Sequence, residues 1–266
     1  MRQAGKPNKK TVTIVDRDER AWELELSATR PVINDLTLEA YSEPAATHRL
    51  ILPYRYEDGR PILIPEAEFK SGTPLTWKYL KAHEDQLRAR ESGKADCDEW
   101  YGYIYPKNLS LFESPKLIVQ VISKYARYAS DTHSIYFTGG GNGPYYGLRW
   151  ATPNDPHSLH YLQALLNSRL LDFYLHRIST TFRGGYFSYG KQFIEQLPIR
   201  PINFGGASER AEHDALVGLV EHILAAKRAA PSADTSALER EIDHRVYCLY
   251  GLTPDEIKLV EEDVRR

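Results

Sequence analysis

Short apolar segments separated by polar turns dominate the first 65 residues, which is the pattern of β-strands. Thr11–Val15 and Trp22–Leu26 lie on either side of the polar turn Asp16–Glu19, so we predict two short strands there. Leu50–Tyr54 and Ile62–Ile64 lie on either side of Asp58-Gly59. Because Asp-Gly favours tight hairpin turns, we expect these two segments to pair.

The centre of the chain changes period several times. Thr76–Arg90 has apolar residues near helical spacing and predicts one helix. Lys116–Ile122 is β-branched and nearly all apolar, which predicts a buried central strand. Ile135–Phe137 predicts another strand. The glycine-rich run Thr138–Gly143 after it lacks the Gly-Lys-Ser/Thr of a phosphate-binding loop, so we expect a tight loop close to another segment or a ligand.

The second half of the chain is predicted to be mostly helical. Asp155-Pro156 is a favourable helix start, and apolar residues continue at helical spacing to Ile178. A brief helix is expected over Lys191–Leu197, and three more over residues 207–266. Within that last segment, Ser236–Glu239 and Thr253–Glu256 have capping-box spacing, and Gly251 is the expected left-handed residue that ends a helix.

Composition fits a globular protein of one or two domains. The 266 residues are 42% hydrophobic and 26% charged, with a mean hydropathy of −0.50. No apolar run approaches the roughly 18 residues of a membrane span, and the polar start Met1–Lys10 predicts no signal peptide. The two cysteines, Cys97 and Cys248, have no metal-ligand or disulfide-framework spacing. We therefore expect a cytoplasmic protein without structural zinc.

Charge is distributed unevenly along the chain. Residues 101–200 carry 10 Lys/Arg against 5 Asp/Glu, a net +5, whereas the whole chain has a net charge of −2. The same segment holds 19 of the 30 aromatic residues. A basic, aromatic-rich centre is compatible with a nucleic-acid surface, and equally with a tyrosine-rich core that has ordinary surface lysines.

The run Thr180–Lys191 is the strongest candidate for chemistry. It combines glycines, hydroxyls, aromatic rings and two cations, the groups that bind phosphodiesters and stack on bases. The alternative is an aromatic loop that fills a core, with Arg183 paired to a carboxylate. Elsewhere, Pro254–Lys258 resembles a nuclease motif only superficially, since contiguous residues at a helix start favour capping. His157 and His160 lack a third metal ligand.

Several motifs, in their order along the chain, resemble the TaqI-like C-terminal specificity domain, the target-recognition part of N6-adenine DNA methyltransferases and type IIG (Eco57I-like) restriction–modification enzymes. The central ones are Tyr161–Leu175, Thr180–Ser188 and Gln196–Ile199. Others that agree are Ile51–Tyr54, Trp100-Tyr101, Ser114–Ile118, Phe137–Gly141, Glu241–Asp243, Val246-Tyr247 and Leu249–Thr253.

The resemblance implies an α+β fold with a mixed β-sheet target-recognition domain over residues 31–204. It further implies a helical C-terminal region over 205–266, and it leaves residues 1–30 weakly matched. The catalytic Asn-Pro-Pro-Tyr/Phe motif and the glycine-rich S-adenosylmethionine loop of such enzymes do not occur here. We therefore expect a DNA-recognition module without catalytic residues, whose partners are double-stranded DNA and an adenine methyltransferase catalytic domain or subunit.

No cofactor is expected in this chain, since S-adenosylmethionine would bind the catalytic partner. The chain is a separated domain, a split subunit or a gene remnant, and the sequence leaves these three origins open. The rival interpretation of its function is a scaffold protein that has lost DNA binding. The expected DNA-binding residues are Lys124, Arg127, Arg149, Arg183, Ser188, Tyr189 and Lys191. Of these, Arg183 and Lys191 are expected to contact phosphate rather than bases. With few cations, the lone chain should bind DNA only weakly.

Overall fold

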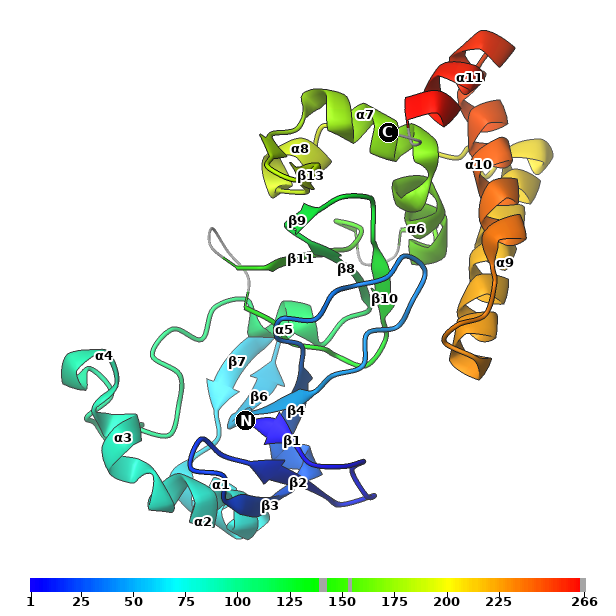
Figure 1. Cartoon of the computed structure of the whole chain (residues 1–266). Helices are drawn as coiled ribbons and strands as arrows, with labels where there is room; N and C mark the ends of the chain where they lie inside the picture. The colour runs from blue at the N-terminus through cyan, green and yellow to red at the C-terminus, as the bar shows by residue number, and fades with distance from the viewer. Residues whose placement is uncertain (139–142, 153–154, 264–266) are drawn as a thin grey trace. The chain divides into compact units, whose positions relative to one another are not determined.

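The computed structural model describes residues 1–138, 143–152 and 155–263, and its fold is α+β as predicted (Figure 1). Two compact units interleave in the sequence. We call residues 1–34, 45–115 and 132–137 the first unit, and residues 35–44, 116–131 and 138–266 the second unit. The predicted segments 1–30, 31–204 and 205–266 are instead consecutive, so their boundaries differ from those of the compact units.

The first unit is built on a five-stranded antiparallel sheet with the order β3-β2-β1-β5-β4. The two strands predicted at the start of the chain are confirmed as its β2–β3 pair, in which Val12 and Leu24 face each other in the core. The strands are β1 (Arg2–Gln3), β2 (Thr11–Val15), β3 (Ala21–Glu25), β4 (Thr29–Val32) and β5 (His48–Ile51).

The predicted hairpin forms across Asp58-Gly59, but with a different first strand. β6 (Tyr54–Glu57) pairs with β7 (Arg60–Leu63). Leu50 and Ile51 belong instead to β5, which pairs with β4. Pro53 separates the two strands, because proline has no backbone N–H to continue a ladder. Of the predicted partner Leu50–Tyr54, only Tyr54 pairs with β7, while Leu50 and Ile51 pair with β4.

Short helices follow the hairpin, and the single helix predicted over Thr76–Arg90 is divided. α2 (Pro74–Ala82) ends at His83, whose ring contacts the backbone carbonyl of Tyr79 at 2.9 Å, and α3 (Glu84–Arg88) begins after it. Trp77 packs against Trp100, and both belong to the core that residues of β2 and β3 also form. The other helices after the hairpin are α1 (Glu66–Gly72), α4 (Arg90–Gly93) and α5 (Leu109–Phe112), and the short helix η1 (Leu26–Ala28) lies earlier, between β3 and β4.

The predicted strand Ile135–Phe137 does not form. Tyr136 makes only an isolated parallel bridge with Val32, using its backbone N–H and carbonyl. Its buried hydroxyl donates to the carboxylate of Glu113 at 2.7 Å. The segment is extended because these contacts hold it, but it lacks a ladder on either side. Of the glycine-rich run that follows, residues 139–142 lie outside the described residues.

The second unit contains the predicted buried strand. β8 (Lys116–Gln120) is the central strand of an antiparallel sheet with the order β10-β8-β11. Leu117, Ile118 and Val119 are fully buried, as their continuous apolar run predicts. Its neighbours are β10 (Ala129–Asp131) and β11 (Tyr145–Leu148).

The helix predicted from Asp155 to Ile178 is two helices, α6 (Leu159–Asn167) and α7 (Arg169–Ile178). The helix also begins later than predicted. Ser158, not Asp155, caps α6, and Asp155 instead accepts a hydrogen bond from the backbone N–H of His157. Ser168 ends one helix and caps the next: its hydroxyl donates to the Leu165 carbonyl and accepts from the Leu171 N–H. The extended backbone at this serine ends the first helix, although the apolar stripe continues from α6 into α7.

Three helices end the chain, as predicted: α9 (Ala207–Ala229), α10 (Ser236–Tyr250) and α11 (Pro254–Asp263). Gly251 is left-handed at the end of α10, and Thr253 with Glu256 forms the predicted capping box. The box predicted at Ser236 is absent, since the Ser236 N–H donates to Asp234. Among the described residues, no helix combines the length and apolar character of a membrane span.

Candidate nucleic-acid interface

The Thr180–Lys191 run forms a β-hairpin in the second unit. β12 (Thr181–Phe182) pairs with β13 (Tyr186–Ser188), and β13 pairs on its other side with β9 (Ile122–Ser123). Gly184 and Gly185 turn the chain with φ of 89° and 78°. L-residues avoid that region while glycine does not, so this pair of glycines permits the sharp turn.

The register gives the small sheet two distinct faces. Phe182 lies opposite Tyr186, and Ser188 lies opposite Ile122. Because side chains alternate along a strand, Phe182, Tyr186 and Ile122 project from the same face, which we call the outer face. All three are exposed, with 44%, 40% and 49% of their surface accessible.

The inner face is held against α7. The ring of Phe187 stacks on the imidazole of His176, with centroids 3.7 Å apart. One residue after the strand, the hydroxyl of Tyr189 donates to a carboxylate oxygen of Asp172 at 2.5 Å. The Tyr189 backbone N–H also donates to the Val121 carbonyl. These contacts fix the hairpin to the helix and to the strand beside it.

Burial dominates the electrostatics beneath the hairpin. Burial raises the pKa of the Asp172 carboxyl, although His176 and the Tyr189 hydroxyl oppose that shift. Burial and the neighbouring Asp172 raise the pKa of the Tyr189 phenol well above its usual value. A phenol that stays protonated remains a donor to Asp172, so this pair serves as a structural anchor.

Three of the predicted DNA-binding residues are exposed cations around this hairpin. The ammonium of Lys124, just after β9, lies 5.2 Å from the centre of the Tyr186 ring. Arg183 occupies the hairpin loop, and Lys191 begins α8 (Lys191–Ile194) directly after the hairpin. In the part of the chain that the structure describes, none of these three side chains forms an ion pair or hydrogen bond, although the Lys191 backbone carbonyl accepts from the Glu195 N–H. Arg183 is thus not paired with a carboxylate.

The other four predicted residues are placed differently. Ser188 and Tyr189 are buried, with 7% and 0% of their surface accessible. The Tyr189 hydroxyl donates to Asp172 of α7, and the Ser188 hydroxyl accepts from the Gly190 N–H. We therefore correct the expectation that these two side chains reach DNA. Arg127 is half-buried and donates to the Leu38 carbonyl. Arg149 is exposed after β11, which belongs to the β10-β8-β11 sheet and not to the hairpin sheet.

The sequence indicates the aromatic character of the hairpin, but it does not indicate that Ile122 lies at the surface. The apolar run Lys116–Ile122 predicts burial throughout, whereas its last residue is half exposed. The reason is a strand break at Val121 that the apolar run does not reveal: β8 ends at Gln120 and β9 begins at Ile122. Beyond that break, the chain leaves the core sheet and joins the hairpin.

Polar residues of α6 in the recognised motif have a structural role. The Asn167 side chain accepts from the Tyr128 N–H and donates to its carbonyl, at 2.8 and 2.9 Å. Gln163, one turn earlier, also donates to the Tyr128 carbonyl. The two amides fix the connection between β9 and β10, and with it the base of the hairpin sheet.

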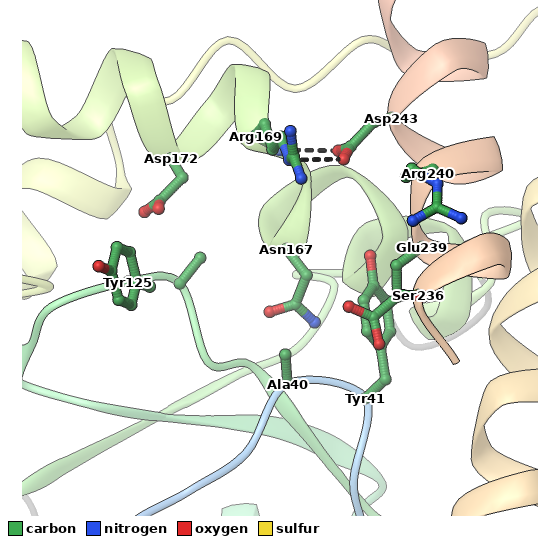
Figure 2. A pocket seen from close by; sticks show the side chains of 11 residues that line it. Ala40, Tyr41, Tyr125, Asn167, Arg169, Asp172, Ser236, Glu239, Arg240 and Asp243 are labelled. Atoms are coloured by element: carbon green, nitrogen blue, oxygen red, sulfur yellow. Dashed lines mark hydrogen bonds and ion pairs between the residues drawn. The ribbon is translucent and has the colours of Figure 1, made fainter. Parts of the chain in front are cut away.

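A second candidate site is a cavity of about 220 Å³ between α7 and α10, with mixed charges in its walls (Figure 2). Asp243 accepts from the Arg169 backbone N–H at 2.9 Å and pairs with its guanidinium at 3.2 Å. Burial raises the pKa of Asp243 to about 7, against the effect of Arg169. Arg169 also pairs with Glu261 of α11.

These contacts join three helices, so the cavity lies at a structural junction. Its walls are formed by Ala40, Tyr41, Tyr125, Ala126, Asn167, Arg169, Asp172, Ser236, Glu239, Arg240 and Asp243. Across residues 1–138, 143–152 and 155–263, no group of three or more His, Cys, Asp or Glu side chains is placed to hold a metal ion.

Comparisons with known proteins agree with the resemblance seen in the sequence. Residues 69–199 match the family model of the TaqI-like C-terminal specificity domain. The chain is 26% identical over 206 residues to the type II restriction enzyme and methyltransferase RM.Eco57I of Escherichia coli, an alignment that covers 73% of this chain and 20% of that protein.

Two methyltransferases show a similar relationship. The type II methyltransferase M.XhoI of Xanthomonas vasicola is 31% identical over 124 residues, and M.PaeR7I of Pseudomonas aeruginosa is 29% identical over 126 residues. The alignments cover 46% and 47% of this chain, and 21% of each relative. The chain thus spans about a fifth of the length of these relatives. Over residues 69–199, it carries a domain of the TaqI-like C-terminal specificity family.

Proposed function

We propose that this chain is the DNA sequence-recognition module of an N6-adenine DNA methyltransferase or a type IIG restriction–modification enzyme. One observation carries the proposal: three exposed cations, Lys124, Arg183 and Lys191, surround a hairpin that lies within the specificity domain. Cations without carboxylate partners are available to phosphate oxygens, and phosphate contacts set the register of a protein on duplex DNA.

We place the chemistry in a partner, since the catalytic motifs of such enzymes do not occur in this sequence. An adenine methyltransferase domain, in cis or in trans, would bind S-adenosylmethionine and the target adenine, since base-directed enzymes need a pocket for the extruded base. Such a pair would act in the cytoplasm, where the genomic DNA of a bacterium lies. A gene immediately upstream of this one whose product contains an Asn-Pro-Pro-Tyr motif would support this assignment.

Fluorescence anisotropy with a labelled duplex tests DNA binding by the chain alone. We expect dissociation constants of roughly 10⁻⁴ to 10⁻⁶ M at physiological salt, because a few phosphate contacts release few counterions. Binding should be tighter at low salt, where the release of those counterions is more favourable. Sequence preference should be small without the catalytic partner. No binding at low salt would contradict the proposal and favour a scaffold protein that has lost DNA binding.

Calorimetry with S-adenosylmethionine tests the division of labour. The chain alone should give no measurable heat of binding and no methyl transfer to DNA. A stoichiometric, micromolar cofactor site in this chain would contradict the assignment of catalysis to a partner.

A further inference from the structure

The outer face of the hairpin exposes three large apolar side chains, Phe182, Tyr186 and Ile122. Phe182 and Tyr186 lie opposite each other beside the turn, and Ile122 projects from the same face one strand away. The inner face already supplies the contacts to the core, through Phe187 on His176 and through buried Tyr189. Clustered exposed apolar side chains commonly mark a binding site.

Charge identifies the chemistry of the partner. Residues 121–130 and 179–194, which include the strands of this sheet, contain no Asp or Glu. Of their four cations, Arg127 pairs with Glu39, whereas Lys124, Arg183 and Lys191 are exposed. Lys124 lies over the Tyr186 ring, which places a cation directly beside the aromatic surface. A partner with negative charge and flat apolar faces satisfies both features, and nucleic acid has both.

We propose that Phe182 and Tyr186 form a wedge that inserts between stacked base pairs of duplex DNA, with Lys124 and Arg183 on the flanking phosphates. The proposal rests on the DNA-recognition function proposed above. Phe182 and Tyr186 pair at the tip of the hairpin, beyond the residues that pair with β9, and apolar side chains that enter a base step partly unstack it and bend the duplex. Gly184 and Gly185 have no side chains, so the loop backbone beside Arg183 can approach the DNA closely.

The wedge predicts local unstacking that phosphate contacts alone do not cause. Duplexes containing 2-aminopurine, which fluoresces more strongly when unstacked, are titrated with the full chain at low salt. We expect fluorescence to rise on binding to duplexes in which the probe occupies the inserted step. In the double variant Phe182→Ala/Tyr186→Ala, the rise should vanish and affinity should fall about tenfold or more, as expected for loss of base–aromatic contacts.

Three controls make the test specific. Tyr174→Ala removes an aromatic side chain of similar exposure, 42%, from α7, and should leave fluorescence and affinity unchanged. Tyr186→Trp keeps an aromatic surface and should retain the fluorescence rise. Urea unfolding verifies that each variant folds. The salt dependence of binding should be the same in the double variant as in the unmodified chain, because no cation is removed.

The possible failures are distinguishable. If the chain binds DNA while 2-aminopurine stays at the free-duplex level at every position tested, the wedge is wrong and the recognition function stands. If the double variant binds DNA normally but no longer associates with its methyltransferase subunit, the outer face docks protein, and the wedge is again overturned. If the unmodified chain does not bind DNA at low salt, both proposals fail.

Discussion

The imidazole of His176 and the phenyl ring of Phe187 stack nearly parallel, with centroids 3.7 Å apart and planes 9° apart. His176 lies in α7 and Phe187 in β13, so this contact fixes the inner face of the hairpin to the helix. Phe187 also lies opposite Thr181 and Ser123 in the register of the sheet. The outer face, which bears Phe182 and Tyr186, is thereby directed away from α7.

Tyr189→Phe should destabilise the second unit. The substitution removes the hydroxyl that donates to buried Asp172 at 2.5 Å, and leaves a carboxyl oxygen without that donor. Loss of a buried hydrogen-bond partner costs about 1–3 kcal/mol, measurable by urea unfolding. Tyr186→Phe is the matched control, because that phenol is exposed and should change stability by less than about 0.5 kcal/mol. Equal effects of the two substitutions would contradict the anchoring role.

Alanine at the hairpin turn should also be unfavourable. Gly185 has a φ of 78° and empty space where a Cβ would lie, so the cost of Gly185→Ala is backbone strain of about 1–2 kcal/mol. Gly218 in α9 likewise has open space but helical geometry. Gly218→Ala should therefore stabilise the chain by about 0.4–1 kcal/mol. Thermal unfolding of both variants measures the two effects, and the same sign for both would refute the strain argument.

Local patterns predicted the elements, whereas tertiary contacts determined which residues reach the surface. The buried run of β8 and the capping box at Thr253 were readable from sequence, because neighbours along the chain decide them. The break at Ser168 was not, since the apolar stripe continues through it. Ser188 and Tyr189 look like ligand-binding residues in the motif, but Asp172, 17 positions earlier, turns Tyr189 inward. No local signal encodes that pairing.

The stability of the chain should depend on pH through Asp243. Its carboxyl has a pKa raised by burial to about 7 in the folded state, compared with about 3.9 in an unfolded chain. Between these values the folded state holds more protons, so stability should fall as pH rises from about 4 to about 7. The contribution of this one group is at most about 1.4 kcal/mol per pH unit.

Urea unfolding of Asp243→Asn across pH 5–8 isolates that contribution. The variant has no ionisable group at this position, so its stability should vary less with pH than that of the unmodified chain. Asp255→Asn, at an exposed carboxyl near the start of α11, is the control and should leave the pH profile unchanged. Parallel profiles for Asp243→Asn and the unmodified chain would show that this carboxyl titrates alike in both states.

Removing a single exposed cation should weaken DNA binding evenly across sequences. Lys191→Ala and Arg183→Ala each remove one expected phosphate contact, so the slope of log affinity against log salt should shrink by about one unit. Lys258→Ala removes an exposed cation from α11 and should leave the slope unchanged. An unaltered slope in Lys191→Ala would contradict its assignment to phosphate. A loss confined to particular DNA sequences would instead indicate base contacts.

Lysine acetylation with and without duplex DNA, read by mass spectrometry, tests the location of the interface most directly because it changes no residue. Lys124 and Lys191 are exposed beside the hairpin, and Lys258 is exposed on α11. If DNA binds at the hairpin, saturating duplex should slow acetylation of Lys124 and Lys191 and leave Lys258 unaffected. Equal reactivity of all three lysines while anisotropy shows DNA bound would contradict this placement.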